Sequence, residues 1–150
     1  PNSLEAIAKA YKHGYKFAVA TNQSGIARKY YTFDDLTQMH NKMNKLLSGL
    51  GAKFEYIAYC PHLPELKCPC RKPEPGLIKE IHEHTQIPYN EIIMIGDRLK
   101  DLRAAITMGA DAALVLTGQG KNELKEHPEL KTNGTKIYDN LEQCLNNLLY

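Results

Sequence analysis

The chain has 150 residues, of which 43% are hydrophobic and 24% charged, and its formal net charge is +2. This length is enough for one domain with a hydrophobic core, and the near-neutral charge gives no sign of nucleic-acid binding. No apolar run approaches the roughly 20 residues of a membrane span, and no signal peptide is visible. We therefore expect a cytoplasmic protein with reduced cysteines that binds neither membranes nor nucleic acid.

Apolar periodicity predicts helices that alternate with short buried strands along the whole chain. In chain order, the predicted elements are helix 4–13, strand 16–21, helix 32–48, strand 54–59, helix 76–86, strand 91–97, helix 99–109, strand 112–117, strand 135–140 and helix 141–150. Such alternation is typical of a parallel sheet with helices on both faces. We predict an α/β fold, with a three-layer, Rossmann-like arrangement, in a single domain that spans residues 1–150.

Polar residues follow directly after several of these strands. In parallel sheets, ligands bind in the crevice outside the carboxyl ends of the strands. The candidate site segments are therefore Thr21 to Ser24, the stretch from Cys60 onward, Gly96-Asp97 and Thr117-Gly118.

The stretch from Cys60 to Gly76 reads CPHLPELKCPCRKPEPG and contains Cys60, His62, Cys68 and Cys70 in the spacing C-x-H-x5-C-x-C. Three thiolates and one imidazole suit a tetrahedral zinc ion, and four protein ligands leave no open position for a reacting water. A disulfide between Cys68 and Cys70 would close a strained ring. The spacing therefore predicts an inserted zinc loop with a structural role, whereas Cys144 is expected to be a small core residue.

Two further segments suit an anion. The stretch TNQSGIAR offers Thr21, Asn22, Gln23, Ser24 and Arg28, whose side chains, with nearby backbone N–H groups, suit phosphate oxygens. An ordinary polar loop explains this segment equally well. Immediately after the last cysteine of the zinc loop come an arginine and a lysine, which the metal would hold in place. A fixed pair of cations at the mouth of a parallel sheet makes a good anion site, although a solvated surface pair is the alternative.

Asp97 is the last residue of the predicted strand 91–97 and can hold a hard cation such as magnesium. Gly96 beside it allows close approach of the backbone. Asp101 lies one helical turn further on. We expect Asp101 to compensate the helix dipole rather than to form part of a site.

The order of Thr21, Lys72 and Asp97, each after its own strand, resembles the haloacid dehalogenase-like phosphatases. The segments TNQSGIAR, CPHLPELKCPCRKPEPG and IGDRLKD resemble the branch of heptose-1,7-bisphosphate 7-phosphatases. Histidinol-phosphate phosphatases are near relatives that share the zinc loop. The resemblance covers almost the whole chain and implies hydrolysis of a phosphorylated sugar, most simply the 7-phosphate of the heptose, through an aspartyl-phosphate.

The resemblance also implies roles for individual residues. Thr21 would bind the transferring phosphoryl group, Lys72 would stabilise its charge, and Asp97 would hold the catalytic magnesium. The substrate contacts would be Asn22, Gln23, Ser24, Arg28 and Arg71. The zinc loop would be structural and would shape the entrance to the site.

The family's nucleophile and general acid lie in a D-x-D segment at the end of a central strand, and this sequence contains no D-x-D. We expect an N-terminally incomplete phosphatase domain that turns over phosphate esters poorly, with unpaired backbone groups beside the missing strand. It would be a monomer, or a second chain would fill the gap. The alternative functions are a histidinol-phosphate phosphatase and a non-catalytic, zinc-stabilised module that binds anions.

Overall fold

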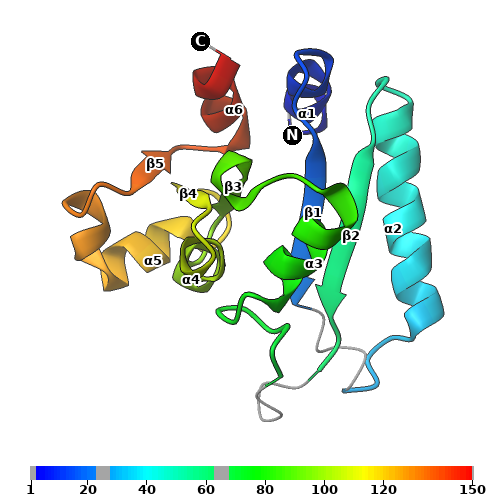
Figure 1. Cartoon of the computed structure of the whole chain (residues 1–150), viewed down its shortest axis with the longest axis horizontal. Helices are drawn as coiled ribbons and strands as arrows, with labels where there is room; N and C mark the ends of the chain where they lie inside the picture. The colour runs from blue at the N-terminus through cyan, green and yellow to red at the C-terminus, as the bar shows by residue number, and fades with distance from the viewer. Residues whose placement is uncertain (1–2, 23–27, 63–67, 150) are drawn as a thin grey trace.

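The computed structural model describes residues 3–22, 28–62 and 68–149. Its elements, in chain order, are α1 (Ser3–Lys12), β1 (Phe17–Asn22), α2 (Phe33–Ser48), β2 (Phe54–Cys60), α3 (Gly76–Thr85), η2 (Tyr89–Glu91), β3 (Ile93–Gly96), α4 (Leu99–Thr107), β4 (Asp111–Val115), α5 (Gly120–Glu126), η3 (Pro128–Lys131), β5 (Lys136–Tyr138) and α6 (Leu141–Leu149) (Figure 1). Every predicted helix and strand is present within a few residues of its expected bounds. The sequence did not predict α5, because GKNELKE has no apolar periodicity.

The helix termini follow the local sequence. Thr32 caps α2: its side chain accepts a hydrogen bond from the Asp35 backbone N–H, while the Asp35 carboxylate accepts one from the Thr32 N–H. This reciprocal capping box satisfies two of the amide groups that a helix start leaves free. Asn140 caps α6 in a similar way, through a 2.8 Å hydrogen bond from the Gln143 N–H to its side-chain oxygen.

The strands form two parallel sheets. One contains β1 and β2, and the other has the order β3-β4-β5. Asn22 lies opposite Cys60 in the first sheet, and Gly96 lies opposite Leu114 in the second. The sequence predicted a parallel sheet with unpaired backbone groups beside a missing strand, and among the described residues the strands form two separate sheets. Consequently β1 and β3 each have one edge without a described partner strand, as expected for a sheet that lacks a central strand.

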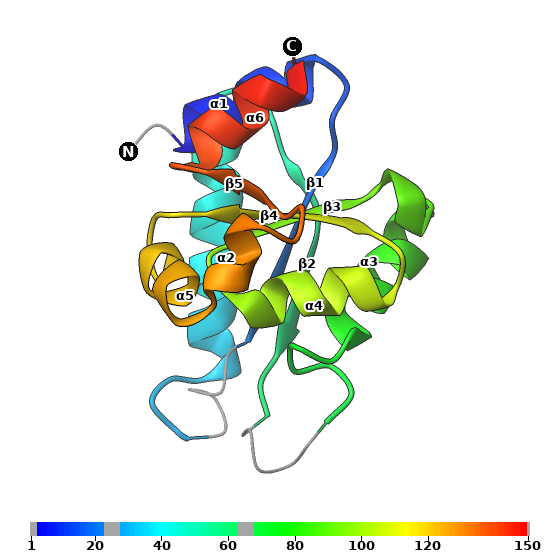
Figure 2. The same ribbon diagram turned by 90° about the vertical axis from the view of Figure 1, so that its left-hand side faces the viewer.

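Helices cover both faces of the strands. Along β4, Leu114 packs in one core cluster with Leu102 of α4, whereas Ala113 and Val115 pack in another with Cys144 of α6. Because successive strand residues point to opposite faces, α4 and α6 lie on opposite sides of the sheet. Figure 2 shows this arrangement, with α1 and α6 together on one side and α3 and α4 on the other. The predicted three-layer α/β architecture is confirmed, and Cys144 is a core residue, as predicted.

Residues at the carboxyl ends of strands from both sheets meet in one cavity. β1 and β2 pair in parallel, so Thr21 and Asn22 lie at the same end as Cys60. Thr21, Lys72, Gly96 and Asp97 line one cavity. The fold therefore brings the sequence-predicted segments into one region. Within the described ranges, no helix is long and apolar enough to cross a bilayer.

Candidate functional site

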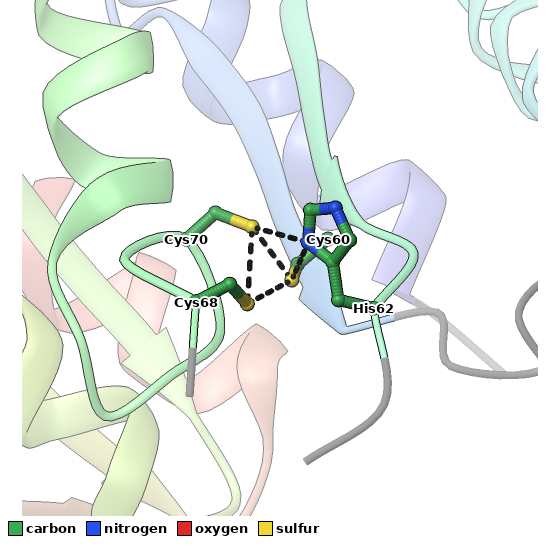
Figure 3. Close-up of side chains that lie close together, drawn as sticks. All are labelled: Cys60, His62, Cys68 and Cys70. Carbon is green, nitrogen blue, oxygen red and sulfur yellow. Dashed lines mark hydrogen bonds between the residues drawn. The ribbon is translucent and has the colours of Figure 1, made fainter. Parts of the chain in front are cut away.

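Four potential metal ligands converge after β2, as Figure 3 shows. The ligand atoms of Cys60, His62, Cys68 and Cys70 all lie within 4.8 Å of one another. The Cys60 Sγ lies 3.3 Å from the Cys68 Sγ and 2.7 Å from the Cys70 Sγ. The His62 Nδ1 lies 3.5 Å from the Cys60 Sγ and 3.3 Å from the Cys70 Sγ. None of these cysteines forms a disulfide. The predicted ligands are therefore brought together.

The geometry fits a tetrahedral ion. Zinc–sulfur bonds of about 2.3 Å place sulfur ligands about 3.8 Å apart in a tetrahedral site. The Cys60–Cys68 separation of 3.3 Å and the Cys68–Cys70 separation of 3.6 Å are close to this value. Only the Cys60–Cys70 separation is clearly shorter. This cluster could hold a metal ion, with Cys60 buried and the histidine exposed.

The thiols influence one another's ionisation. Burial raises the pKa of Cys60, and burial together with the neighbouring thiols Cys60 and Cys68 raises the pKa of Cys70. Burial also opposes ionisation of Cys68, but its hydrogen bonds with Cys60 and Cys70 outweigh burial and lower its pKa to about 7. One thiol of the three thus ionises near neutral pH. Simultaneous ionisation of all three needs a cation among them, since metal ligation requires thiolates.

Lys72 follows the cluster and is anchored to the end of β1. Its backbone N–H donates a 3.1 Å hydrogen bond to the Asn22 Oδ1, and its ammonium donates a 2.9 Å hydrogen bond to the Ala20 carbonyl. The Asn22 Nδ2 is buried and has no hydrogen-bond partner among the described residues. A buried donor without a partner is uncommon and indicates a missing acceptor. An oxygen-rich ligand at this position would supply one.

Asp101 has a different role from the one the sequence suggested. It lies in the first turn of α4, as predicted, but its side chain is buried and lies 2.6 Å from the Lys72 ammonium. The side chains of Lys72 and Asp101 are only 9% and 8% exposed. A Cβ added to Gly96 would lie 2.6 Å from the Asp101 side chain, so a larger residue there would displace the carboxylate. The expectation of a merely dipole-compensating acid was therefore wrong.

Asp97 is held by the loop after β4. Its Oδ2 accepts a 2.9 Å hydrogen bond from the Gln119 backbone N–H. Gly118 has φ +56°, and a Cβ added to it would lie 2.3 Å from the Asp97 Oδ2. A glycine is required both by this backbone conformation and by the close approach of the carboxylate. Asp97 therefore has a fixed orientation at the carboxyl end of β3.

Several cations lie in the region of Asp101. Arg71 donates a 3.5 Å hydrogen bond from Nη1 to the His62 carbonyl, which ties it to the cysteine cluster. Burial lowers the pKa of Lys100, and so does the positive charge of Arg98, Arg71 and Lys72, whereas Asp101 raises it. Repulsion among cations in a partly buried region indicates a place where a bound anion would be stabilised.

Most of the sequence-predicted residues lie in this region. Thr21, Lys72 and Asp97 line the same cavity of about 480 Å³. Arg28 is exposed, and no described contact places it beside Lys72. Gln23 and Ser24 lie outside the described residues. The sequence analysis missed Lys100 and underestimated Asp101. Both belong to the segment IGDRLKD, and their closeness to Asp97 in the sequence was the signal that could have identified them.

A cavity at the carboxyl ends of parallel strands, lined by the anchored Lys72 and the fixed Asp97, is suited to phosphate esters. Together with the parallel sheets, this cavity is typical of an enzyme with an α/β fold that hydrolyses phosphate esters. The profile of the HAD-hydrolase-like family matches residues 69–144.

Curated relatives carry a more specific name. D-glycero-beta-D-manno-heptose-1,7-bisphosphate 7-phosphatase of Neisseria meningitidis serogroup A is 43% identical over 93% of this chain and 74% of its own length. The enzyme of the same name from Pseudomonas putida is 43% identical over 99% of this chain and 83% of its own. The chain belongs to the haloacid dehalogenase-like hydrolases, in their heptose-bisphosphate phosphatase branch.

Comparison with solved structures gives the same family. The D,D-heptose 1,7-bisphosphate phosphatase of Bordetella bronchiseptica, a complex with magnesium and phosphate, matches with a TM-score of 0.91 at 35% identity. The match covers 99% of this chain and 82% of that one. The corresponding phosphatase from Burkholderia thailandensis matches with a TM-score of 0.76 at 33% identity, over 99% of this chain and 84% of that chain.

Proposed function

We propose that this protein is a phosphatase domain that acts in the removal of the 7-phosphate from D-glycero-D-manno-heptose 1,7-bisphosphate. The observation that carries the proposal is the cavity in which Lys72 lies between Asn22 of β1 and Asp101 of α4. The names of the relatives support the heptose as substrate rather than histidinol phosphate. The proposed reaction breaks the phosphorus–oxygen bond to the sugar and releases the sugar alcohol and inorganic phosphate.

Three residues would act on the transferring phosphoryl group. The Lys72 ammonium would stabilise its negative charge, with Asp101 fixing the position of the ammonium. Thr21 would donate a hydrogen bond to a phosphoryl oxygen. Asn22 contributes the buried Nδ2 donor that has no described partner, which a phosphoryl oxygen would satisfy.

Metal ions would have two separate places. Asp97 is the proposed magnesium ligand, and magnesium there would supply positive charge next to the phosphoryl oxygens. The hydrogen bond that Gln119 donates to its Oδ2 leaves further lone pairs for a cation. Cys60, His62, Cys68 and Cys70 are the proposed zinc ligands, and zinc with four protein ligands is structural. Because the next two residues are an arginine and a lysine, the zinc loop would orient the phosphate-binding cations.

Further contacts to the sugar are proposed for Arg71 and for the loop residues Gln23, Ser24 and Arg28. The resemblance places the nucleophile on an aspartate of a D-x-D segment, and residues 1–150 contain none. We therefore propose that these 150 residues bind the substrate and the metals but turn over little substrate without such a segment. A non-catalytic anion-binding module is the second candidate, and the same missing aspartates motivate it.

A phosphate-release panel tests the proposal. Residues 1–150, alone and joined to a strand that carries D-x-D, are assayed with magnesium on heptose 1,7-bisphosphate and on histidinol phosphate. We expect release from the heptose substrate by the joined protein alone, with a loss of about 10²-fold or more in Lys72→Met. Comparable turnover by residues 1–150 alone would refute the role of the D-x-D segment. A preference for histidinol phosphate would refute the heptose assignment, and no release by either protein would favour the anion-binding module.

A further inference from the structure

The three thiols of the cysteine cluster differ in accessibility. Cys60, the last residue of β2, is fully buried, whereas Cys68 and Cys70 are partly exposed. Oxidation of a cysteine depends on the access of the oxidant to the sulfur. A peroxide that reaches the cluster therefore meets Cys68 or Cys70 before it meets Cys60.

The distances within the cluster single out one pair of thiols. The Cys60 Sγ lies 2.7 Å from the Cys70 Sγ and 3.3 Å from the Cys68 Sγ, and the sulfurs of Cys68 and Cys70 are 3.6 Å apart. Only one residue separates Cys68 from Cys70, so a bond between these two would close a strained ring. Figure 3 shows the three sulfur atoms turned toward one another. Cys60 and Cys70 are thus the pair whose sulfurs need the smallest movement to form a bond.

The surrounding backbone holds both members of this pair in place. Cys60 lies opposite Asn22 in the ladder between β1 and β2. Cys70 packs against the buried core between β2 and α3. The Gly76 N–H donates a 2.9 Å hydrogen bond to the Pro69 carbonyl, and a Cβ added to Gly76 would lie 2.6 Å from the Cys70 Cα. The chain before α3 is therefore folded back tightly, with Cys70 beside the end of β2.

Cys144 is a contrasting thiol in the same chain. It lies on α6 and is fully buried in the cluster with Ala113 and Val115 of β4. Burial raises the pKa of its thiol to about 11. A thiol that is protonated and inaccessible is unreactive. Cys144 therefore serves as an internal control for oxidation of the cluster.

We propose that Cys60 and Cys70 form a reversible disulfide when hydrogen peroxide oxidises the cluster. In the first step the Cys70 sulfur attacks one peroxide oxygen, the O–O bond breaks, and Cys70 becomes a sulfenic acid as one water leaves. In the second step the Cys60 sulfur attacks the Cys70 sulfur, the S–O bond breaks, and a second water leaves. The two thiols together give up two hydrogens, and the peroxide is reduced to two water molecules. A thiol reductant reverses the bond by exchange.

The disulfide takes over from the metal as the link between two parts of the chain. It uses two of the four proposed zinc ligands, so the tetrahedral set of protein ligands is no longer complete. It also joins the end of β2 to the residue that precedes Arg71 and Lys72, and it closes a loop of eleven residues. Oxidation therefore releases zinc but keeps these two cations close to β2. This redox chemistry goes beyond the proposed function and requires no phosphate release.

Peroxide treatment of the 150-residue chain tests the proposal. The reduced chain, with zinc or after chelation, is treated with hydrogen peroxide, and disulfide-linked peptides are identified by mass spectrometry. In both samples we expect a single disulfide between Cys60 and Cys70, which dithiothreitol reverses. In the first sample we expect zinc to be released in step with it. A disulfide that includes Cys68, or oxidation to sulfinic or sulfonic acids without a disulfide, would overturn the proposal, and so would an unchanged mass.

Cysteine variants identify the pair independently. Cys70→Ser is expected to slow disulfide formation by about tenfold or more, because the sulfurs that remain, those of Cys60 and Cys68, lie farther apart. Cys68→Ser keeps the proposed pair, and Cys144→Ala changes a thiol outside the cluster. Both are expected to react within about twofold of the rate of the unmodified chain. Equal slowing in Cys68→Ser and Cys70→Ser would contradict the pairing.

Thermal unfolding tests whether the disulfide links the two parts of the chain. The oxidised, zinc-free chain is expected to melt about 5 °C or more above the reduced, zinc-free chain, because the disulfide closes a loop in the unfolded state. Cys70→Ser, treated for the same time, is the control and is expected to show little rise. An oxidised chain that melts at or below the reduced one would contradict the link. Because none of these measurements follows phosphate release, the proposal can fail independently of the proposed function.

Discussion

Replacing Lys72 with methionine is expected to lower the free energy of unfolding by about 3 to 5 kcal/mol. The ammonium lies 2.6 Å from Asp101, and both side chains are more than nine-tenths buried. Methionine keeps most of the side-chain length but removes the charge, so the Asp101 carboxylate would remain buried without its cation. Urea unfolding at neutral pH, with the slope compared between variants, measures the loss.

Two matched variants show whether burial of the ion pair causes the expected loss of stability. The double variant Lys72→Met/Asp101→Leu is expected to regain most of the lost stability, because replacing a buried ion pair with apolar residues is often nearly neutral. Lys136→Met breaks the exposed pair with Asp111, where the side chains are 48% and 61% exposed, and is expected to cost less than about 1 kcal/mol. If Lys72→Met costs no more than Lys136→Met, the buried Lys72–Asp101 pair does not stabilise the fold more than an exposed pair does.

Removal of zinc is the second change with a large expected effect. An ion that binds only the folded chain stabilises it by about 4 kcal/mol when its free concentration is a thousand times its dissociation constant. The four ligands come from the end of β2 and from residues that precede α3, so a bound ion would join these two parts of the chain, and chelation is expected to lower the melting temperature. Elemental analysis is expected to give about one zinc ion per chain.

Cysteine variants separate zinc ligation from core packing. Cys68→Ser is expected to lose zinc and to make the melting temperature insensitive to chelators. Cys144→Ala is the control, because Cys144 is fully buried in the cluster with Ala113 and Val115. We expect Cys144→Ala to lose stability but to keep its zinc. Less than half an equivalent of zinc in the unmodified protein, together with folding that chelators do not affect, would contradict a zinc site.

The parts of the site that could be predicted are those encoded within a short stretch. The proposed zinc ligands lie within eleven residues, so their spacing alone indicated a cluster, and the structure brings Cys60, His62, Cys68 and Cys70 together. Thr21 and Asp97 were proposed because each comes at the end of a strand, and the structure places both on the lining of one cavity. The three-layer fold followed from alternating helical and strand patterns in the same way.

The parts that could not be predicted depend on distant contacts. Lys72 and Asp101 are far apart in sequence, and nothing local to Asp101 distinguishes a buried partner from an acid in a first helical turn. The structure places the edges without a described partner strand on β1 and β3, a position that no single element encodes. The helix α5 escaped prediction because only Leu124 among its residues is a large apolar residue.

Substrate binding tests the central claim most directly, because it requires no turnover. Heptose 1,7-bisphosphate is titrated calorimetrically into the 150-residue chain with magnesium, at a temperature where the variants are folded. The account predicts saturable binding that Lys72→Met weakens by about tenfold or more, since hydrogen bonds to charged groups contribute about 1.5 to 3 kcal/mol, and that Lys136→Met leaves unchanged. No binding, or equal affinity in Lys72→Met, would contradict it.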